Sequence, residues 1–169
     1  FQATQDGEPI TNFRSARIKG LLIYLAYTAG QSHARGKLAA LFWPDEPDGV
    51  AKKNLRQSLY RLRQLLGEAD GDAQPFIWVN RSTVQWNASS DYQLDVTNFL
   101  SAWEQEELET VVDSYQGELL PDFGCDSDTF DEWLRQERDR LQRIALDALF
   151  ALTGQRLAQA AYGEAQSLA

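Results

Sequence analysis

The sequence is poor in the residues that most often build reactive or metal-binding sites. Its 169 residues include one Cys, one His and no Met. A single Cys excludes an intramolecular disulfide and a Cys-rich metal site, and it fits a reducing cytoplasm, where we expect the protein to work. There is also no Gly-rich phosphate loop. These absences argue against an enzyme, so we expect no catalytic residues, no metal and no cofactor.

Long apolar runs are missing as well. No run of 18 or more apolar residues occurs in the sequence, which argues against a transmembrane segment and a membrane partner. We expect no signal peptide at Phe1, although a longer chain could carry one. Because no initiating Met is present, we expect the chain to be a piece of a longer protein, in which more helical repeats or a regulatory domain follow.

The most informative stretch runs from residue 32 to residue 66. It predicts a short helix, Ala34 to Phe42, a break at Trp43-Pro44 with an acidic loop, and a longer helix, Val50 to Leu66. Four leucines of the longer helix recur at i, i+4, i+7 and i+11 and predict one buried stripe: Leu55, Leu59, Leu62 and Leu66. Two helices joined by a turn, the second one basic, are typical of a helix-turn-helix that presents a helix to DNA.

The side of the second helix opposite the leucines is polar. At about 100° per residue it carries Lys53, Gln57, Tyr60, Arg61 and Gln64, with Asn54 on its shoulder. Arg and Lys pair with guanine or phosphate, and Asn and Gln pair with adenine. Arg56 and Arg63 flank the stripe and are better placed for phosphates. The alternative is an ordinary solvated helix face, and for this helix alone the two interpretations are about equally probable.

A strand hairpin follows the basic helix. Phe76 to Asn87 is rich in β-branched and aromatic residues and is interrupted by a turn at Arg81-Ser82. That turn predicts a register in which Val79 faces Val84 and Ile77 faces Trp86. In a winged helix, such a hairpin lies beside the recognition helix, and an Arg at its tip can enter the minor groove. A turn residue in solvent is the somewhat more probable interpretation of Arg81 alone.

The N-terminal stretch predicts a second hairpin and a first helix. Asp6-Gly7 is a strong hairpin turn signal. A helix follows over Ser15 to Tyr27, with Ser15 as its N-cap and Gly30 as its stop. His33, the only histidine, is expected to help start the next helix or to touch a phosphate.

The C-terminal half predicts helices only. One stripe lies between Val96 and Trp103, with Asp95 as its N-cap, and another lies between Leu108 and Tyr115, stopped by Gly117. A long helix begins near Asp128 and is ended or weakened at Gly154, after which the last residues resemble the start of another helix. Such helix pairs suit a TPR-like array, whose members need neighbours to cover their faces.

Several of these motifs resemble one family. LAALFWPD (Leu38 to Asp45) and NLRQSLYRLRQLL (Asn54 to Leu66) are similar to the winged-helix domain of antibiotic-regulatory-protein (SARP) transcriptional activators, itself related to the OmpR/PhoB output domain. Downstream, DYQLDVTNFLSAW, YQGELLPDF and WLRQERDRL resemble the bacterial transcriptional activator domain (BTAD) that follows it. The implied fold is mainly α with small β hairpins, a winged helix-turn-helix domain at 1–90 and an all-α, TPR-like domain at 91–169, truncated at its end.

The resemblance also implies roles for particular residues. DNA contacts would fall on the recognition helix and the wing tip, at Lys53, Asn54, Gln57, Ser58, Tyr60, Arg61, Arg63 and Arg81. RNA polymerase would be contacted by the loop that holds Pro44, Asp45, Glu46 and Asp48, although the position of Asp48 before a helix N-terminus explains that residue by itself. Family members often bind direct repeats as head-to-tail pairs, so a homo-oligomer on DNA is an open alternative.

The charge of the chain leaves a second interpretation. The formal net charge is −9, which is unusual for a DNA-binding protein. Residues 1–90 hold 11 Lys/Arg and 8 Asp/Glu, a net of +3, while residues 91–169 hold 5 and 17, a net of −12. Such asymmetry indicates two modules, with a boundary near Ala88-Ser89-Ser90. The sequence therefore favours a DNA-binding transcriptional activator, and the alternative is a TPR-like protein-interaction module whose winged helix contacts protein.

Overall fold

The computed structural model describes the backbone of residues 2–68 and 74–167, and the side chains within these ranges up to residue 160. Two compact units are present. The first comprises residues 1–92 together with 120–134, and the second comprises residues 93–119 together with 135–169. Residues 120–134 were assigned to the second module from the sequence and belong to the first unit. The independence of residues 1–90 as a domain stays a prediction.

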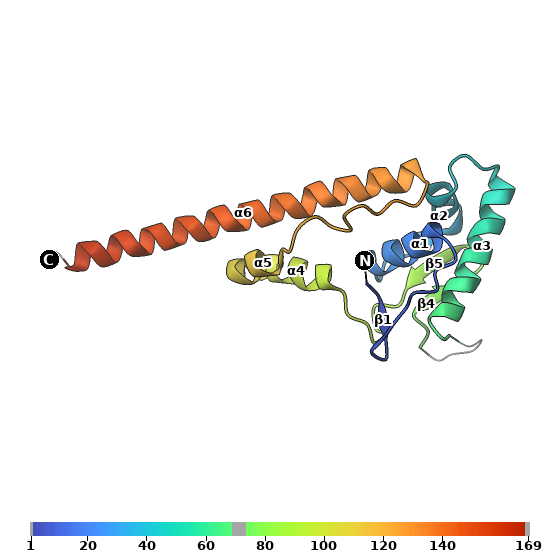
Figure 1. The fold of residues 1–169 in the computed structure, drawn as a ribbon, viewed down its shortest axis with the longest axis horizontal. Coiled ribbons are helices and arrows are strands. Elements are labelled where there is room, and N and C mark those ends of the chain that lie inside the picture. The colour runs from blue at the N-terminus through green and yellow to red at the C-terminus, as the bar shows by residue number, and fades with distance from the viewer. Residues whose placement is uncertain (1, 69–73, 168–169) are drawn as a thin grey trace. The chain divides into compact units, whose positions relative to one another are not determined.

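Three helices form the centre of the first unit: α1 (Ala16–Tyr27), α2 (Arg35–Phe42) and α3 (Asp48–Leu65) (Figure 1). Helix α1 begins where the sequence predicted, because the side chain of Ser15 accepts a hydrogen bond from the Ile18 amide at 3.3 Å. Helix α3 packs against both α2 and α1. It begins two residues earlier than predicted, after Pro47.

The strands form two small antiparallel sheets. Strands β1 (Thr4–Gln5) and β2 (Glu8–Pro9) form the hairpin predicted at Asp6-Gly7. Strands β3 (His33–Ala34), β4 (Ile77–Val79) and β5 (Thr83–Trp86) form a sheet in the order β3-β5-β4. The predicted wing register is confirmed, because Ile77 pairs with Trp86 and Val79 with Val84.

Strand β3 corrects the expectation for His33. The residue lies in a strand that pairs with β5, and its Nε2 atom forms a hydrogen bond of 2.7 Å with the Thr28 hydroxyl. Its ring packs near Tyr24. Burial lowers the pKa of His33 below its ordinary value. His33 is therefore a structural residue that joins the end of α1 to the sheet, and it does not start α2.

Residues 120–134 complete the core of the first unit. Phe130 is fully buried and its ring centroid lies 5.2 Å from that of Phe42, at the end of α2. Trp133 packs edge-to-face on Tyr24 and Tyr27 of α1. Hydroxyl groups of the same segment satisfy the C-terminal end of α2, since the Ser127 Oγ donates to the Leu41 carbonyl at 2.6 Å. The segment thus holds α1 and α2 together.

The second unit contains helices only in its described part. Helices α4 (Asp95–Glu104) and α5 (Leu108–Ser114) lie beside each other, and α6 (Asp128–Ser167), which begins in the first unit, continues through the second. Three expectations are corrected here. Asp95 is the first residue of α4 and Leu94 is its N-cap, α5 ends before Gly117, and α6 continues through Gly154 to Ser167, where the sequence predicted the start of another helix.

The fold class predicted from the sequence is confirmed. The chain is mainly helical, with small antiparallel sheets, and combines a winged helix-turn-helix with a helical unit. Among the described residues, no helix is both long enough and apolar enough to cross a membrane.

Candidate nucleic-acid interface

Helix α3 has one buried side and one exposed side, as its sequence predicted. Leu55, Leu59 and Leu62 are at most 2 % exposed, and Leu66 follows them just after the helix. This stripe fixes the rotation of the helix about its axis, because turning it would bring leucines into water. The side opposite the stripe is consequently presented to solvent.

The exposed side of α3 carries cations and hydrogen-bonding groups. Tyr60 is 62 % exposed, and its hydroxyl accepts a hydrogen bond of 2.8 Å from the Gln64 Nε2. The exposed residues on this side include those predicted to contact DNA: Lys53, Gln57, Tyr60 and Arg61. Asn54 is partly buried, in keeping with its predicted place on the shoulder. Between Lys52 and Leu65 the helix contains no acidic residue, so nothing on the helix neutralises this side.

Two of the predicted contact residues are engaged within the first unit, one by burial and one by an ion pair. Ser58 is only 7 % exposed and faces the buried side of α3. The Arg63 Nε lies 2.8 Å from a carboxylate oxygen of Glu68, whose side chain is 2 % exposed. The other Glu68 oxygen accepts from the Ile77 amide, at the start of β4. Arg63 therefore helps to join α3 to the wing, which the spacing of leucines could not reveal.

The tip of the wing is held in a defined turn. The Asn80 Oδ1 accepts hydrogen bonds from the amides of Ser82 and Thr83 at 2.8 and 2.7 Å. Arg35, in the first turn of α2, donates to the Asn80 carbonyl at 3.0 Å. Arg81 is exposed at this tip, as predicted. The Asn80-Arg81-Ser82 sequence predicted the turn, but only the structure shows that Arg35 stabilises it.

The loop between α2 and α3 is anchored at its start and exposed afterwards. Trp43 is 5 % exposed, whereas Pro44, Asp45 and Glu46 all lie on the surface. Asp48 belongs to the first turn of α3 and pairs with the Lys52 Nζ at 2.7 Å, one helical turn later. The loop therefore displays two acidic side chains, and Asp48 has the local role expected of an acid near a helix N-terminus.

No other arrangement for chemistry stands out in the part of the chain that the structure describes. Within residues 2–68 and 74–160, no three His, Cys, Asp or Glu side chains converge on a position for a metal ion. Cys125 is fully buried, and burial, with Asp131 nearby, raises the pKa of its thiol to about 12. Such a thiol stays protonated at neutral pH and is a poor nucleophile.

Fold and surface together describe a winged helix-turn-helix unit with a basic helix face, followed by a helical unit. A similar fold occurs in EmbR of Mycobacterium tuberculosis, solved in complex with a low-affinity phosphopeptide, with a TM-score of 0.60 and 18 % identity. The match covers 87 % of this chain and 41 % of the EmbR chain, so this chain spans less than half of that protein. No family model and no curated protein matches the sequence. The likeness supports a SARP-like fold.

Proposed function

We propose that this chain is the DNA-binding part of a transcriptional activator of the SARP type. Helix α3 would enter the major groove of duplex DNA, the β4-β5 wing would lie along the adjacent minor groove, and the acidic loop before α3 would contact RNA polymerase. In this assignment Lys53, Asn54, Gln57 and Tyr60 meet the groove, and Arg81 meets the minor groove.

One observation carries this proposal more than any other. The exposed side of α3 combines Lys53, Gln57, Arg61 and Gln64 with a buried side that is entirely covered. A helix whose outer side faces only solvent can carry acidic residues there. A helix that contacts the phosphates and base edges of DNA is expected to lack them, because the DNA phosphates would repel a carboxylate.

The net charge of the chain does not oppose this assignment. Electrostatic interactions across water decay over about 8 to 10 Å at physiological salt. The charge that DNA meets is therefore that of the contacting surface, and residues 1–90 carry a net of +3 from 11 Lys/Arg and 8 Asp/Glu. Weak non-specific binding follows from the modest size of this excess, so specificity has to come from the base contacts.

The polymerase contact has a separate basis. Asp45 and Glu46 are exposed beside the recognition helix, and the buried Trp43 anchors the loop that presents them. A protein bound to DNA through α3 would display these acids to a neighbour on the same DNA. The double substitution Asp45→Asn and Glu46→Gln should lower transcription from a bound promoter in a purified system. DNA affinity should stay unchanged or rise slightly, because repulsion between the loop and the DNA phosphates is reduced.

The experiment that tests DNA binding is a site selection followed by a titration. The full chain is incubated with a random duplex library, and the bound fraction is amplified and sequenced. Binding to the selected duplex is then measured at two salt concentrations, with Arg143→Gln as a control that removes one cation from α6. We expect an enriched sequence and an affinity that falls with salt. A library that yields no enrichment, and no binding at low salt, would overturn the proposal.

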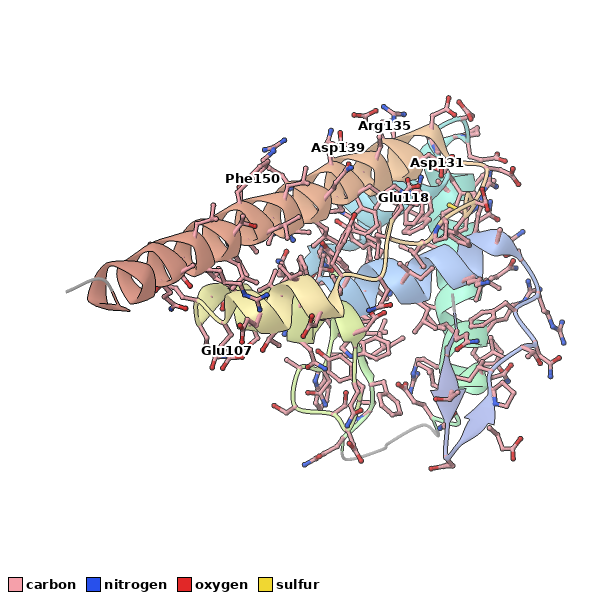
Figure 2. All side chains as sticks on the ribbon, turned by 60° about the vertical axis from the view of Figure 1, so that its left-hand side comes forward. Glu107, Glu118, Asp131, Arg135, Asp139 and Phe150 are labelled. Atoms are coloured by element: carbon pink, nitrogen blue, oxygen red, sulfur yellow. The ribbon has the colours of Figure 1, made fainter. Side chains whose placement is uncertain are left out.

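A second candidate function is supported by a different part of the chain. Leu146, Leu149, Phe150 and Leu157 of α6 are each 46 to 73 % exposed, and Figure 2 shows Phe150 projecting outward from the helix. Exposed apolar residues that recur along one helix are typical of protein contacts. A helical protein-interaction module would use this surface whether or not α3 binds DNA. The selection experiment distinguishes the two functions.

A further inference from the structure

An open hollow of about 570 Å³ lies beside the second half of α3. Thr11, Asn12 and Arg14, which precede α1, line one side of it, and Arg61 and Gln64 line the other. The lining residues include two arginines and no Asp or Glu. Because Arg14 and Arg61 are far apart in the chain, no local pattern predicts that they share one site.

The two arginines of this hollow, like Arg56 and Arg81, differ from three other arginines of the first unit. Arg17, Arg35 and Arg63 each bond to another residue of that unit. Arg14 and Arg61 are exposed, and no hydrogen bond or ion pair joins either of them to another residue within 2–68 or 74–160. Two cations facing one space without an anion are unfavourable by mutual repulsion, which an anionic ligand would relieve.

The N-terminus of α1 adds to the positive field at the hollow. Ile18, in the first turn of α1, also lines the space, and this turn contains no acidic residue. The amides at the start of a 12-residue helix carry positive partial charge that nothing on α1 offsets. This contribution is secondary to that of the two guanidinium groups, and it has the same sign.

The hollow lies on the flank of α3 away from the wing. Arg61 and Arg63 are two positions apart and so point about 200° from each other around the helix. Arg63 is held by Glu68, which also bonds to the first residue of β4, so the wing lies on the Arg63 flank. The polar side of α3 therefore has the wing on one flank and the two-arginine hollow on the other. A major groove likewise has one phosphate backbone on each side, so a helix that enters the groove would bring each flank near one backbone.

We propose that this hollow binds a phosphate group, and that this group is one phosphate of the DNA backbone, a step that rests on the proposed DNA binding. Arg14 is thereby a DNA-contacting residue outside the helix-turn-helix and the wing. Arg61, for which the sequence left guanine and phosphate as alternatives, contacts the same phosphate. Loss of Arg61 should weaken binding to all sequences alike, leaving base preference to Asn54, Gln57 and Gln64.

The test pairs a protein change with a change in one phosphate. Arg14→Gln and the control Arg143→Gln are compared with the parent on the selected duplex. A set of duplexes, each with one neutral methylphosphonate linkage, is titrated with all three proteins. We expect Arg14→Gln to lower the slope of log K against log salt by up to about 0.9, the value for one phosphate. At one linkage, neutralisation should weaken Arg14→Gln less than it weakens the parent and the control, because only Arg61 then remains to contact that phosphate.

Each result decides a different point. A parent that binds no duplex overturns the proposed function and this site with it. A parent that binds DNA, with Arg14→Gln showing an unchanged slope or equal sensitivity at every linkage, overturns the site alone. A further titration adds inorganic phosphate or chloride, at matched ionic strength, as a competitor of DNA binding.

If phosphate competes better than chloride only when Arg14 is present, and Arg14→Gln alters the effect of no methylphosphonate linkage, the hollow is a site for free anions and the DNA assignment is overturned. If phosphate and chloride compete equally, and Arg14→Gln alters the effect of one linkage, the DNA assignment is supported.

Discussion

Helices α3 and α6 each bury one apolar stripe but differ in what the opposite side carries. In α3 the stripe is covered throughout, as Leu55 and Leu62 are 0 % exposed, and the opposite side is polar. In α6 the stripe is covered from Phe130 to Ala148, both 0 % exposed, but Phe150, about 200° around the helix from Phe130, is 73 % exposed. Periodicity thus identifies a helix and its buried side, whereas the residues opposite that side decide whether the helix faces a polar or an apolar partner.

The largest expected effect separates the two sides of α6. Phe130→Ala should cost about 3–5 kcal/mol of unfolding free energy, because it removes a ring from the cluster with Phe42. Phe150→Ala, the same change on the same helix, should change stability by less than about 0.5 kcal/mol. Urea unfolding of both variants measures the difference. Equal costs would mean that Phe150 is covered in solution and that the contrast within α6 is wrong.

Leu59→Ala in α3 should cost about 2–5 kcal/mol, since Leu59 is 2 % exposed at the centre of the leucine stripe. DNA binding should then fail with the melting of the first unit and return at temperatures where the variant stays folded. A melting curve that matches the parent would show that α3 presents its other side to the core, and the assigned DNA surface would have to be abandoned.

The single cysteine offers a direct readout of the segment that completes the first unit. Cys125 is fully buried and the pKa of its thiol is raised to about 12, so labelling by a thiol reagent at pH 8 should require opening of that segment. Phe130→Ala should therefore increase the labelling rate, and Phe150→Ala should leave it unchanged. Fast labelling of the folded parent would show that residues 120–134 do not stay packed in the first unit.

Elements with a local signal were predictable from the sequence. The wing register followed from strand alternation around one turn, and Ile77 does pair with Trp86. The rotation of α3 followed from its leucines, and the start of α1 followed from Ser15. In each case the deciding interaction joins residues close in the chain or repeats at a fixed period.

The parts that the sequence did not reveal depend on contacts between distant residues. Nothing local showed that Phe130 shares a core with Phe42. The sharing of one hollow by Arg14 and Arg61 belongs to the same class. Strand β3 has only two residues and is too short to show alternation.

These long-range contacts sharpen the predicted boundary near residue 90. A fragment of residues 1–90 retains every element proposed to meet DNA but lacks Ser127, Phe130 and Trp133. We expect it to melt well below the full chain and, while folded, to bind DNA at low salt at least as well, since the acidic half is removed. Circular dichroism melting with a duplex titration measures both properties. A fragment as stable as the full chain would show that residues 120–134 contribute little.

The smallest expected effect on folding, and the most direct test of DNA binding, is a substitution on the exposed side of α3. Lys53→Ala should leave the melting temperature unchanged, weaken binding to all duplexes alike and lower the slope of log K against log salt by about one unit, while Arg143→Gln on α6 changes neither. Titration of the parent and both variants with one duplex at several salt concentrations decides the matter. Identical slopes for all three proteins would contradict the assignment of α3 as the surface that meets DNA.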